Sequence, residues 1–333
     1  MALRDAMPGS SSPQWTWRYR YSLFTVLSTI ALICWGGFVT SIEAGMAFPD
    51  WPTSLGSYNL INPVDRWWAV TPYLAEHGHR LIAGAVGFLT IGLAVWTWRS
   101  DPRSWMHRLG WAALALVIFQ GLLGGLRVLW VSLDLAMVHA SVAQIFFATL
   151  VAMTLFTTRM WREREGLLPE GTTTDRFRRL ALMTSGLIYL QIVLGALLRH
   201  PGRGVDGVFA AIHVTGAFLV TGAVFALFVM AQKHYAGNVV LKRATGALVG
   251  IVGLQFALGL AAYVLMLYEA PEGIRSTAQV LLTVGHLVVG ALLFAGSVVT
   301  ALLARRSSVD VPSDGAASAS ASTAQPVLSV HES

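Results

Sequence analysis

The chain reads EHGHR at residues 76–80 and then LIAGAVGFLTIGLAVWTW at residues 81–98. The second stretch is long enough to cross a bilayer as a helix. Ionisable side chains are costly to keep at the mouth of a membrane helix, so EHGHR is a candidate functional site. The alternative is a polar helix start that faces water. His79 has three counterparts at matching places in the chain and Glu76 has none, which favours a functional site.

Composition indicates a multi-pass membrane protein. Of the 333 residues, 55% are hydrophobic and only 12% are charged, and the mean hydropathy is +0.61; an ordinary soluble protein is less apolar. The net charge of +6 does not indicate nucleic-acid binding, because the basic residues do not gather on one soluble face. The single cysteine, Cys34, lies in an apolar stretch, so no internal disulfide and no thiol metal site are expected.

Eight apolar segments predict an all-α integral membrane protein with eight transmembrane helices in the lipid bilayer. The segments are residues 22–41, 78–98, 108–129, 135–156, 179–199, 208–231, 243–266 and 278–303. Because the first residues are polar and lack an apolar core followed by a cleavage site, we expect no removable signal peptide.

Segment order and composition divide the chain into five parts. Residues 1–21 form an N-terminal tail, 22–157 a first four-helix half, 158–178 a linker, 179–304 a second four-helix half and 305–333 a tail. The last part is rich in Ser, Ala and Pro, and we expect it to be disordered.

Basic residues are distributed unevenly between the two predicted sides of the membrane. With a cytoplasmic N-terminus, most of the 23 Lys and Arg residues fall on the inner side, as the positive-inside rule expects. The six on the outer side are Arg66, Arg80, Arg127, Arg199, Arg203 and Arg275. Both termini and the linker are therefore predicted to be cytoplasmic.

An internal repeat relates the two halves of the chain. A shift of about 134 residues places His79 on His213 and, after an insertion in the last outer loop, His139 on His286. A Gln-x-x-Leu-Gly motif in each half also superposes. The predicted architecture is thus two tandem four-helix bundles. Parallel repeats also occur in transporters, so the repeat alone names no function.

The four repeated histidines predict two haem sites. Each lies within about two turns of the outer end of an even-numbered predicted helix, so all four lie at similar depth. In each half, two imidazoles on neighbouring helices can face one another across a flat cofactor, which is how helix bundles hold haem iron. The residues four positions later share the histidine's helix face and are all small, leaving room for a porphyrin. They are Ala83, Ala143, Ala217 and Gly290.

These histidines have two other interpretations. An isolated membrane histidine can be a helix-to-helix hydrogen-bond partner. A zinc or copper site is disfavoured, because no Cys and no tightly spaced second ligand accompany His79 and His139. Loop or helix-edge histidines receive no ligand role; these are His77, His107, His200, His234 and His331.

Over residues of about 22–304 the chain resembles the haem A synthases of bacterial and mitochondrial membranes, which have eight helices in tandem halves. The resemblance rests on Pro49-Asp50-Trp51-Pro52, on Glu76-x-x-His79-Arg80, on Gln-x-x-Leu-Gly at Gln120, Gln191 and Gln255, and on the histidines of helices four, six and eight. That family oxidises a methyl group of haem O to a formyl group, making haem A for cytochrome oxidase.

The resemblance implies a membrane oxidoreductase in the cytoplasmic membrane of a bacterium, with its haem sites towards the outer side. Haem O would be its substrate, haem b its cofactor and electron relay, and haem O synthase and an electron acceptor its partners. The implied site residues are His79 and His139 for the substrate haem, His213 and His286 for haem b, Glu76 for catalysis, and Arg80 and Arg199 for the haem propionates.

Two departures from the family pattern qualify this comparison. Many members have a cysteine pair in the first outer loop, and this chain has none there. Val214 follows His213, whereas Arg80 follows His79. The second half would therefore anchor its propionates through Arg199 or Arg203, or without arginine.

The repeat also assigns the chemistry to the first half. Glu76 superposes on Ala210, and an insertion carrying residues 49–52 has no counterpart in the second half. Only the first half thus has a carboxylate and a loop able to exclude water from a reactive site. The alternative for the loop is a Trp-rich interfacial segment. Glu76 would take a proton from attacking water or stabilise positive charge at the haem methyl, or else merely cap its helix.

The mechanism implied by the resemblance is two successive hydroxylations of the haem methyl, after which the gem-diol loses water. Two rival functions remain open at this point. One is a dihaem electron-transfer protein that leaves both haems unmodified. The other is a transporter with a parallel repeat that uses its histidines as a proton relay.

Overall fold

A computed structural model of the protein describes residues 13–163, 168, 171–198, 207–266 and 275–306. This part of the chain is helical, and it contains no strand apart from an isolated bridge between Ser54 and Ser57. The elements are α1 (Pro13–Ser41), η1 (Trp67–Ala69), α2 (Thr71–Ser100), α3 (Ser104–Leu129), α4 (Leu133–Thr157), α5 (Arg159–Glu163), α6 (Thr172–Leu198), α7 (Gly207–His234), α8 (Val239–Met266) and α9 (Thr277–Arg305).

Within the described ranges, eight helices are long and apolar enough to cross a membrane, which confirms the predicted number of spans. The protein is a multi-pass membrane protein. All eight of these helices begin before the predicted segments, because an apolar pattern marks the membrane core and misses the polar first turns. The clearest case is α2, which begins at Thr71, with Pro72 in its first positions, where proline is preorganised for a helix.

The early start of α2 overturns one alternative for Glu76. A carboxylate that caps a helix lies in its first turn, but the first turn of α2 holds no acidic residue. Glu76 lies in the second turn, where its charge cannot cap the helix N-terminus. The Glu76 carboxylate therefore has another role than capping α2.

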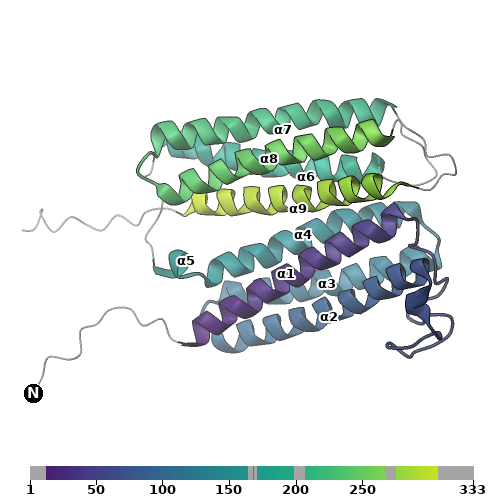
Figure 1. Cartoon of the computed structure of the whole chain (residues 1–333). Coiled ribbons are helices and arrows are strands. Elements are labelled where there is room, and N and C mark those ends of the chain that lie inside the picture. Colours follow the sequence, from purple (N-terminus) through teal and green to yellow (C-terminus); the bar gives the residue numbers. More distant parts are fainter. Residues whose placement is uncertain (1–12, 164–167, 169–170, 199–206, 267–274, 307–333) are drawn as a thin grey trace, which may run out of the picture.

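The helices pack as two groups of four. In the first group α1 and α3 each pack against α2 and α4, and in the second α6 and α8 each pack against α7 and α9. Figure 1 shows the groups stacked, with α9 lying along α1 and α4. The loops after α1 and α3 lie at one end of the stack (Figure 1), called here the histidine end because the four repeated histidines lie near it.

A continuous core joins the two groups. Phe146, Phe147 and Leu150 on α4 are buried with Leu93 on α2 and Ala291 on α9. Burying each such side chain contributes on the order of 1.5–3 kcal/mol in water; within a bilayer, close packing is the main contribution. This packing fixes the rotation of α4 and α9, and hence the direction in which their histidines point.

At the end opposite the histidines, a buried charge cluster holds α1 to the turn between α2 and α3. Asp101 has a fully buried side chain that pairs with Arg18 at 2.8 Å and with Arg103 at 2.8 Å. Burial by itself raises the pKa of the Asp101 carboxyl, but hydrogen bonds from Arg103 and the charge of Arg18 outweigh it and hold that pKa below its ordinary value.

Asp101→Asn should lower the free energy of unfolding by about 3 kcal/mol, because it leaves a buried guanidinium without its charge partner. Thermal unfolding in detergent measures this, with the exposed Asp65→Asn as control. Because the folded pKa is lowered, the stabilisation is present above the unfolded value of about 3.9 and is lost as pH falls through the folded pKa. Equal melting of both variants would contradict the prediction.

Candidate functional site

Each of the four repeated histidines packs against a glycine on the preceding membrane helix. The pairs are His79 with Gly36, His139 with Gly124, His213 with Gly195 and His286 with Gly259. A Cβ atom added at these glycines would lie between 2.7 and 3.4 Å from the imidazole Cε1. The missing side chains therefore let the four imidazoles lie directly on neighbouring backbone, in the same way in every helix pair.

In the second group, the imidazoles of His213 and His286 face each other with ring centroids 6.3 Å apart and ring planes at 73°. Two imidazoles bound to opposite sides of one metal ion would have ring centres about 6 Å apart, given metal–nitrogen bonds of about 2 Å. The spacing of this pair therefore fits two axial ligands of one haem iron.

The tautomer of His286 also fits metal binding. Its Nδ1 lies 3.1 Å from the Gln255 backbone carbonyl, which can only accept, so Nδ1 carries the proton and Nε2 carries the lone pair. An Nδ1–H bond to a backbone carbonyl is the usual support of a metal-binding histidine. Here the Gln255 amide donates to Nε2 at 3.2 Å, and iron at Nε2 would replace that bond.

In the first group, His79 and His139 lie within electrostatic range of each other. The Nδ1 atom of His79 is buried and has no hydrogen-bond partner in the described part of the chain. Gln120, with its amide nitrogen turned towards His139, donates to Nδ1 of that ring at 3.0 Å. The two rings of this pair thus differ, because Nδ1 of His139 has a partner on α3 and Nδ1 of His79 has none among the described residues.

Glutamines one turn deeper than the glycines are site residues that the sequence predicts only as markers of the repeat and of the family resemblance. Gln120 contacts His139 and Gln255 contacts His286, while Gln191 lies against Gly216. The signal that finds them is the spacing Gln-x-x-x-Gly, which places both residues on the helix face that meets the histidine. At the matching position of α1 the residue is Leu32.

Glu76 is buried beside His79, and both of its carboxylate oxygens are engaged. Oε2 accepts the backbone N–H of Phe48 at 2.9 Å, and Oε1 accepts Nη2 of Arg80 at 2.6 Å. Its side chain is 6% exposed. The carboxylate thus joins the loop between α1 and α2 to the helix that carries His79.

The same loop is held by Arg80. Its Nη1 donates to the Thr53 carbonyl at 2.8 Å and to the Ser54 hydroxyl at 3.3 Å, and its Nη2 also donates to the Asp50 carbonyl at 3.0 Å. All four terminal N–H groups therefore have acceptors in the loop or on Glu76. The propionate role predicted for Arg80 stays a prediction.

Asp50 organises the interior of this loop. Its carboxylate accepts the N–H groups of Leu55 and Gly56, both at 2.8 Å, and the Thr53 hydroxyl. Partial burial raises the pKa of the Asp50 carboxyl, but these hydrogen bonds together hold it below its ordinary value. The loop thus has a defined conformation over the first histidine pair.

Side chains from two directions fasten the loop to the helices. The ring of Trp51 lies against Gly125 on α3, and the guanidinium of Arg127 lies against Gly45. His77, to which no ligand role was given, is buried and donates from Nε2 to the Leu60 carbonyl at 2.8 Å. The loop therefore covers the α2–α3 side of the first pair.

The two histidine pairs approach each other across the contact between α1 and α9. Gly36 faces His79, and the next residue, Gly37, faces Leu287, which follows His286. A Cβ added at Gly37 would lie 2.9 Å from the end of the Leu287 side chain, so a larger residue there would force that side chain to shift. Arg199 and Arg203, predicted as propionate anchors, lie outside the described residues.

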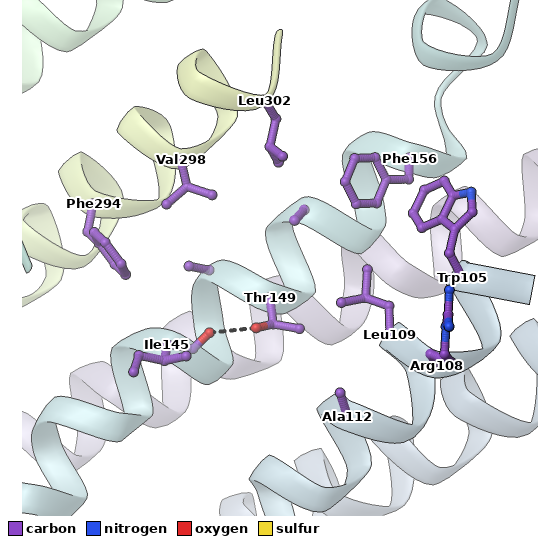
Figure 2. Close-up of a pocket in the computed structure, with 12 residues that line it drawn as sticks. Trp105, Arg108, Leu109, Ala112, Ile145, Thr149, Phe156, Phe294, Val298 and Leu302 are labelled. Atoms are coloured by element: carbon purple, nitrogen blue, oxygen red, sulfur yellow. Dashed lines mark hydrogen bonds between the residues drawn. The ribbon is translucent and has the colours of Figure 1, made fainter. Parts of the chain in front are cut away.

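An apolar groove lies elsewhere, between α3, α4 and α9. Figure 2 shows Trp105 and Arg108 at one end and Ile145 and Phe294 towards the other. Its volume of about 630 Å³ would hold an organic ligand. None of the predicted site residues lines it, so it is not the histidine site.

Fold and site together define a helical membrane protein with two inward-facing imidazole pairs, one of which is covered by a carboxylate-anchored loop. Residues 19–211 match the family described as cytochrome oxidase assembly protein (COX15-CtaA). The chain belongs to this family. The matched segment includes Glu76, His79 and His139 and ends just before His213.

Similar proteins carry the name heme A synthase. The protein of Shouchella clausii is 26% identical over 274 residues, which is 75% of this chain and 87% of the relative. That of Alkalihalophilus pseudofirmus is 27% identical over 276 residues, which is 81% of this chain and 84% of the relative. The protein of Exiguobacterium sibiricum is 29% identical over 187 residues, 55% of this chain and 59% of the relative.

Proposed function

We propose that this protein is a haem A synthase, an oxidoreductase that converts the methyl group of haem O into a formyl group. The observation that carries the proposal is the Glu76 carboxylate, buried next to one of two similar histidine pairs in a chain of the cytochrome oxidase assembly family. The second pair has Ala210 at the position of Glu76. One half is thus equipped for chemistry and the other for holding a cofactor.

The reaction removes four electrons from the methyl carbon. Two successive hydroxylations give an alcohol and then a gem-diol, which loses water to leave the aldehyde. Haem O is the substrate in the first half, where His79 and His139 would hold it. His213 and His286 would hold haem b, which supplies a one-electron carrier on the path to an external electron acceptor.

Glu76 and the loop bound to it are the groups that the protein would place beside the methyl group of the substrate haem. An ionised carboxylate there would accept a proton from an attacking oxygen nucleophile or stabilise positive charge that develops at the methyl carbon. The loop fastened by Arg80 and Trp51 would exclude bulk water from reactive intermediates. Its many bonds to the helices favour this role over that of a passive interfacial segment.

The proposal includes a division of the chain into two tandem four-helix bundles, residues 22–157 and 179–304, with both termini cytoplasmic and the haem sites towards the outer side. The close approach of α1 and α9 at Gly37 and Leu287 supports electron transfer between the halves. Haem O synthase, which supplies the substrate, is the partner expected on the same membrane.

The proposal is tested by expressing the chain in a bacterial host that makes haem O but no haem A, and by extracting the haems in acidic acetone. We expect haem A and a hydroxylated intermediate, identified by mass, and neither in cells that carry the empty vector. A protein that binds haem but yields only unmodified haems would instead be an electron carrier. A colourless protein would favour a transporter.

A further inference from the structure

A second arginine of the first half, Arg127 in the last turn of α3, has unused hydrogen-bonding capacity. Its Nη2 donates to the Gly45 carbonyl at 3.1 Å. Its Nε is buried without a hydrogen-bond partner among the described residues. No carboxylate of the described ranges forms an ion pair with it. The Nε–H and Nη–H edge of a guanidinium is the edge that binds a carboxylate through two parallel bonds.

The charges around the covered histidine pair do not balance. Arg80 and Arg127 are both cations near Glu76, and that carboxylate is bound by Arg80 and the Phe48 N–H. The positive charge of Arg127 is therefore not neutralised by a carboxylate of the described residues, and it lies in a partly buried place. Such a charge is costly to keep there, and an anionic ligand would offset the cost.

Arg127 is also placed at the edge of the site where a ligand held by the histidines would end. It follows Gly124, which packs on His139, by three residues, so it lies on nearly the same face about one turn nearer the histidine end. It lies within electrostatic range of both His79 and His139. The guanidinium of Arg127 packs on Gly45, where an added Cβ atom would collide with Nη2.

We propose that Arg127 binds a carboxylate substituent of the tetrapyrrole held between His79 and His139, and thereby selects substrates with a free carboxylate at that edge. This inference rests on the proposed function for the identity of the substrate. Arg80 differs from Arg127 because its terminal N–H groups already serve the loop and Glu76. Arg80 therefore positions the loop, and Arg127 recognises the substrate.

The test compares haem O with its dimethyl ester, in which both carboxylates are blocked. Purified full-length protein that already holds its second-half haem is titrated with each ferric compound and followed by Soret absorbance. In the unchanged protein we expect tighter binding of the free acid. Arg127→Gln should weaken binding of the free acid about tenfold or more, as expected for charge-assisted bonds, and leave binding of the ester unchanged.

Arg108→Gln, an exposed arginine at the other end of α3, is the control and should change neither affinity. Equal weakening of acid and ester by Arg127→Gln would mean that Arg127 only holds the loop, and an unchanged acid affinity would equally overturn the proposal. Should Arg127→Gln fail to fold, Arg127→Lys is titrated instead. A reduced preference for the acid then supports the proposal, and an undiminished preference contradicts it.

Product analysis separates this inference from the proposed function. Protein that binds haem O with the expected dependence on Arg127, yet forms no haem A, would contradict haem A synthesis and leave carboxylate recognition standing. If the protein forms haem A but binds haem O and its dimethyl ester equally well, carboxylate recognition by Arg127 is contradicted and haem A synthesis stands.

Discussion

Replacing His213 or His286 by alanine should remove most of the low-spin b-type absorption that we expect of the purified protein, to below about a tenth of the original signal. A low-spin spectrum needs both axial positions of the iron filled by strong ligands. The 6.3 Å centroid spacing of this pair is that of two imidazoles on one metal, so neither ring can be spared. The measurement is the reduced-minus-oxidised spectrum per mole of protein.

Two controls make this result specific. His234→Ala changes an exposed histidine at the far end of the helix that carries His213, and it should leave the spectrum intact. His79→Ala should leave much of the b-type signal, because in the proposed arrangement it removes a ligand of the substrate haem only. Equal loss of signal from changes in both halves would contradict the proposed division between a substrate site and a cofactor site.

Glu76→Gln should lower the rate of haem A formation about a hundredfold or more, the size of a lost general base. The variant keeps the size of the side chain and removes its charge. It should insert into the membrane, retain the second-half haem and accumulate haem O or its alcohol. Extraction and mass analysis of the haems, normalised to the amount of protein, measure the effect.

The structure supplies the rival explanation that this experiment must exclude. Because Glu76 accepts hydrogen bonds from Phe48 and Arg80, its change to glutamine also loosens the loop. Asp50→Asn loosens the same loop from within and leaves the Glu76 carboxylate in place. Similar activities of the two variants would mean that Glu76 only holds the loop in place. A much larger loss of activity in Glu76→Gln than in Asp50→Asn would support a chemical role.

Several features of the protein could be predicted from the sequence because they depend on local pattern. The length of each apolar segment predicts a membrane helix whatever the helix packs against, and all eight candidate spans were found in this way. Helix starts were less accurate. Residues 71–77 are helical but not apolar enough to belong to the predicted segment, and for that reason Glu76 was weighed as a cap.

The depth of the histidines could be predicted from the sequence repeat, but the role of the glutamines could not. A repeat in sequence implies a repeat in structure, so the four histidines were expected at one depth, and each does pack on a glycine of the preceding helix. The glutamines carry the same repeat, but their meaning depends on which face of the neighbouring helix they meet. That rotation is set by core packing around residues such as Phe147 and Leu150.

The sequence by itself determined the membrane-helix fold, the number of spans and the four repeated histidines, because length, hydropathy and spacing along a helix are properties of neighbouring residues. The tertiary structure alone decided the partners of the charged groups. The sequence predicts both Arg80 and Arg127 on the outer side. In the structure, Arg80 donates to the loop that folds back over α2, whereas Nε of Arg127 has no hydrogen-bond partner among the described residues. Which donor meets which acceptor depends on the path of that loop, which brings residues far apart in the chain within hydrogen-bonding distance.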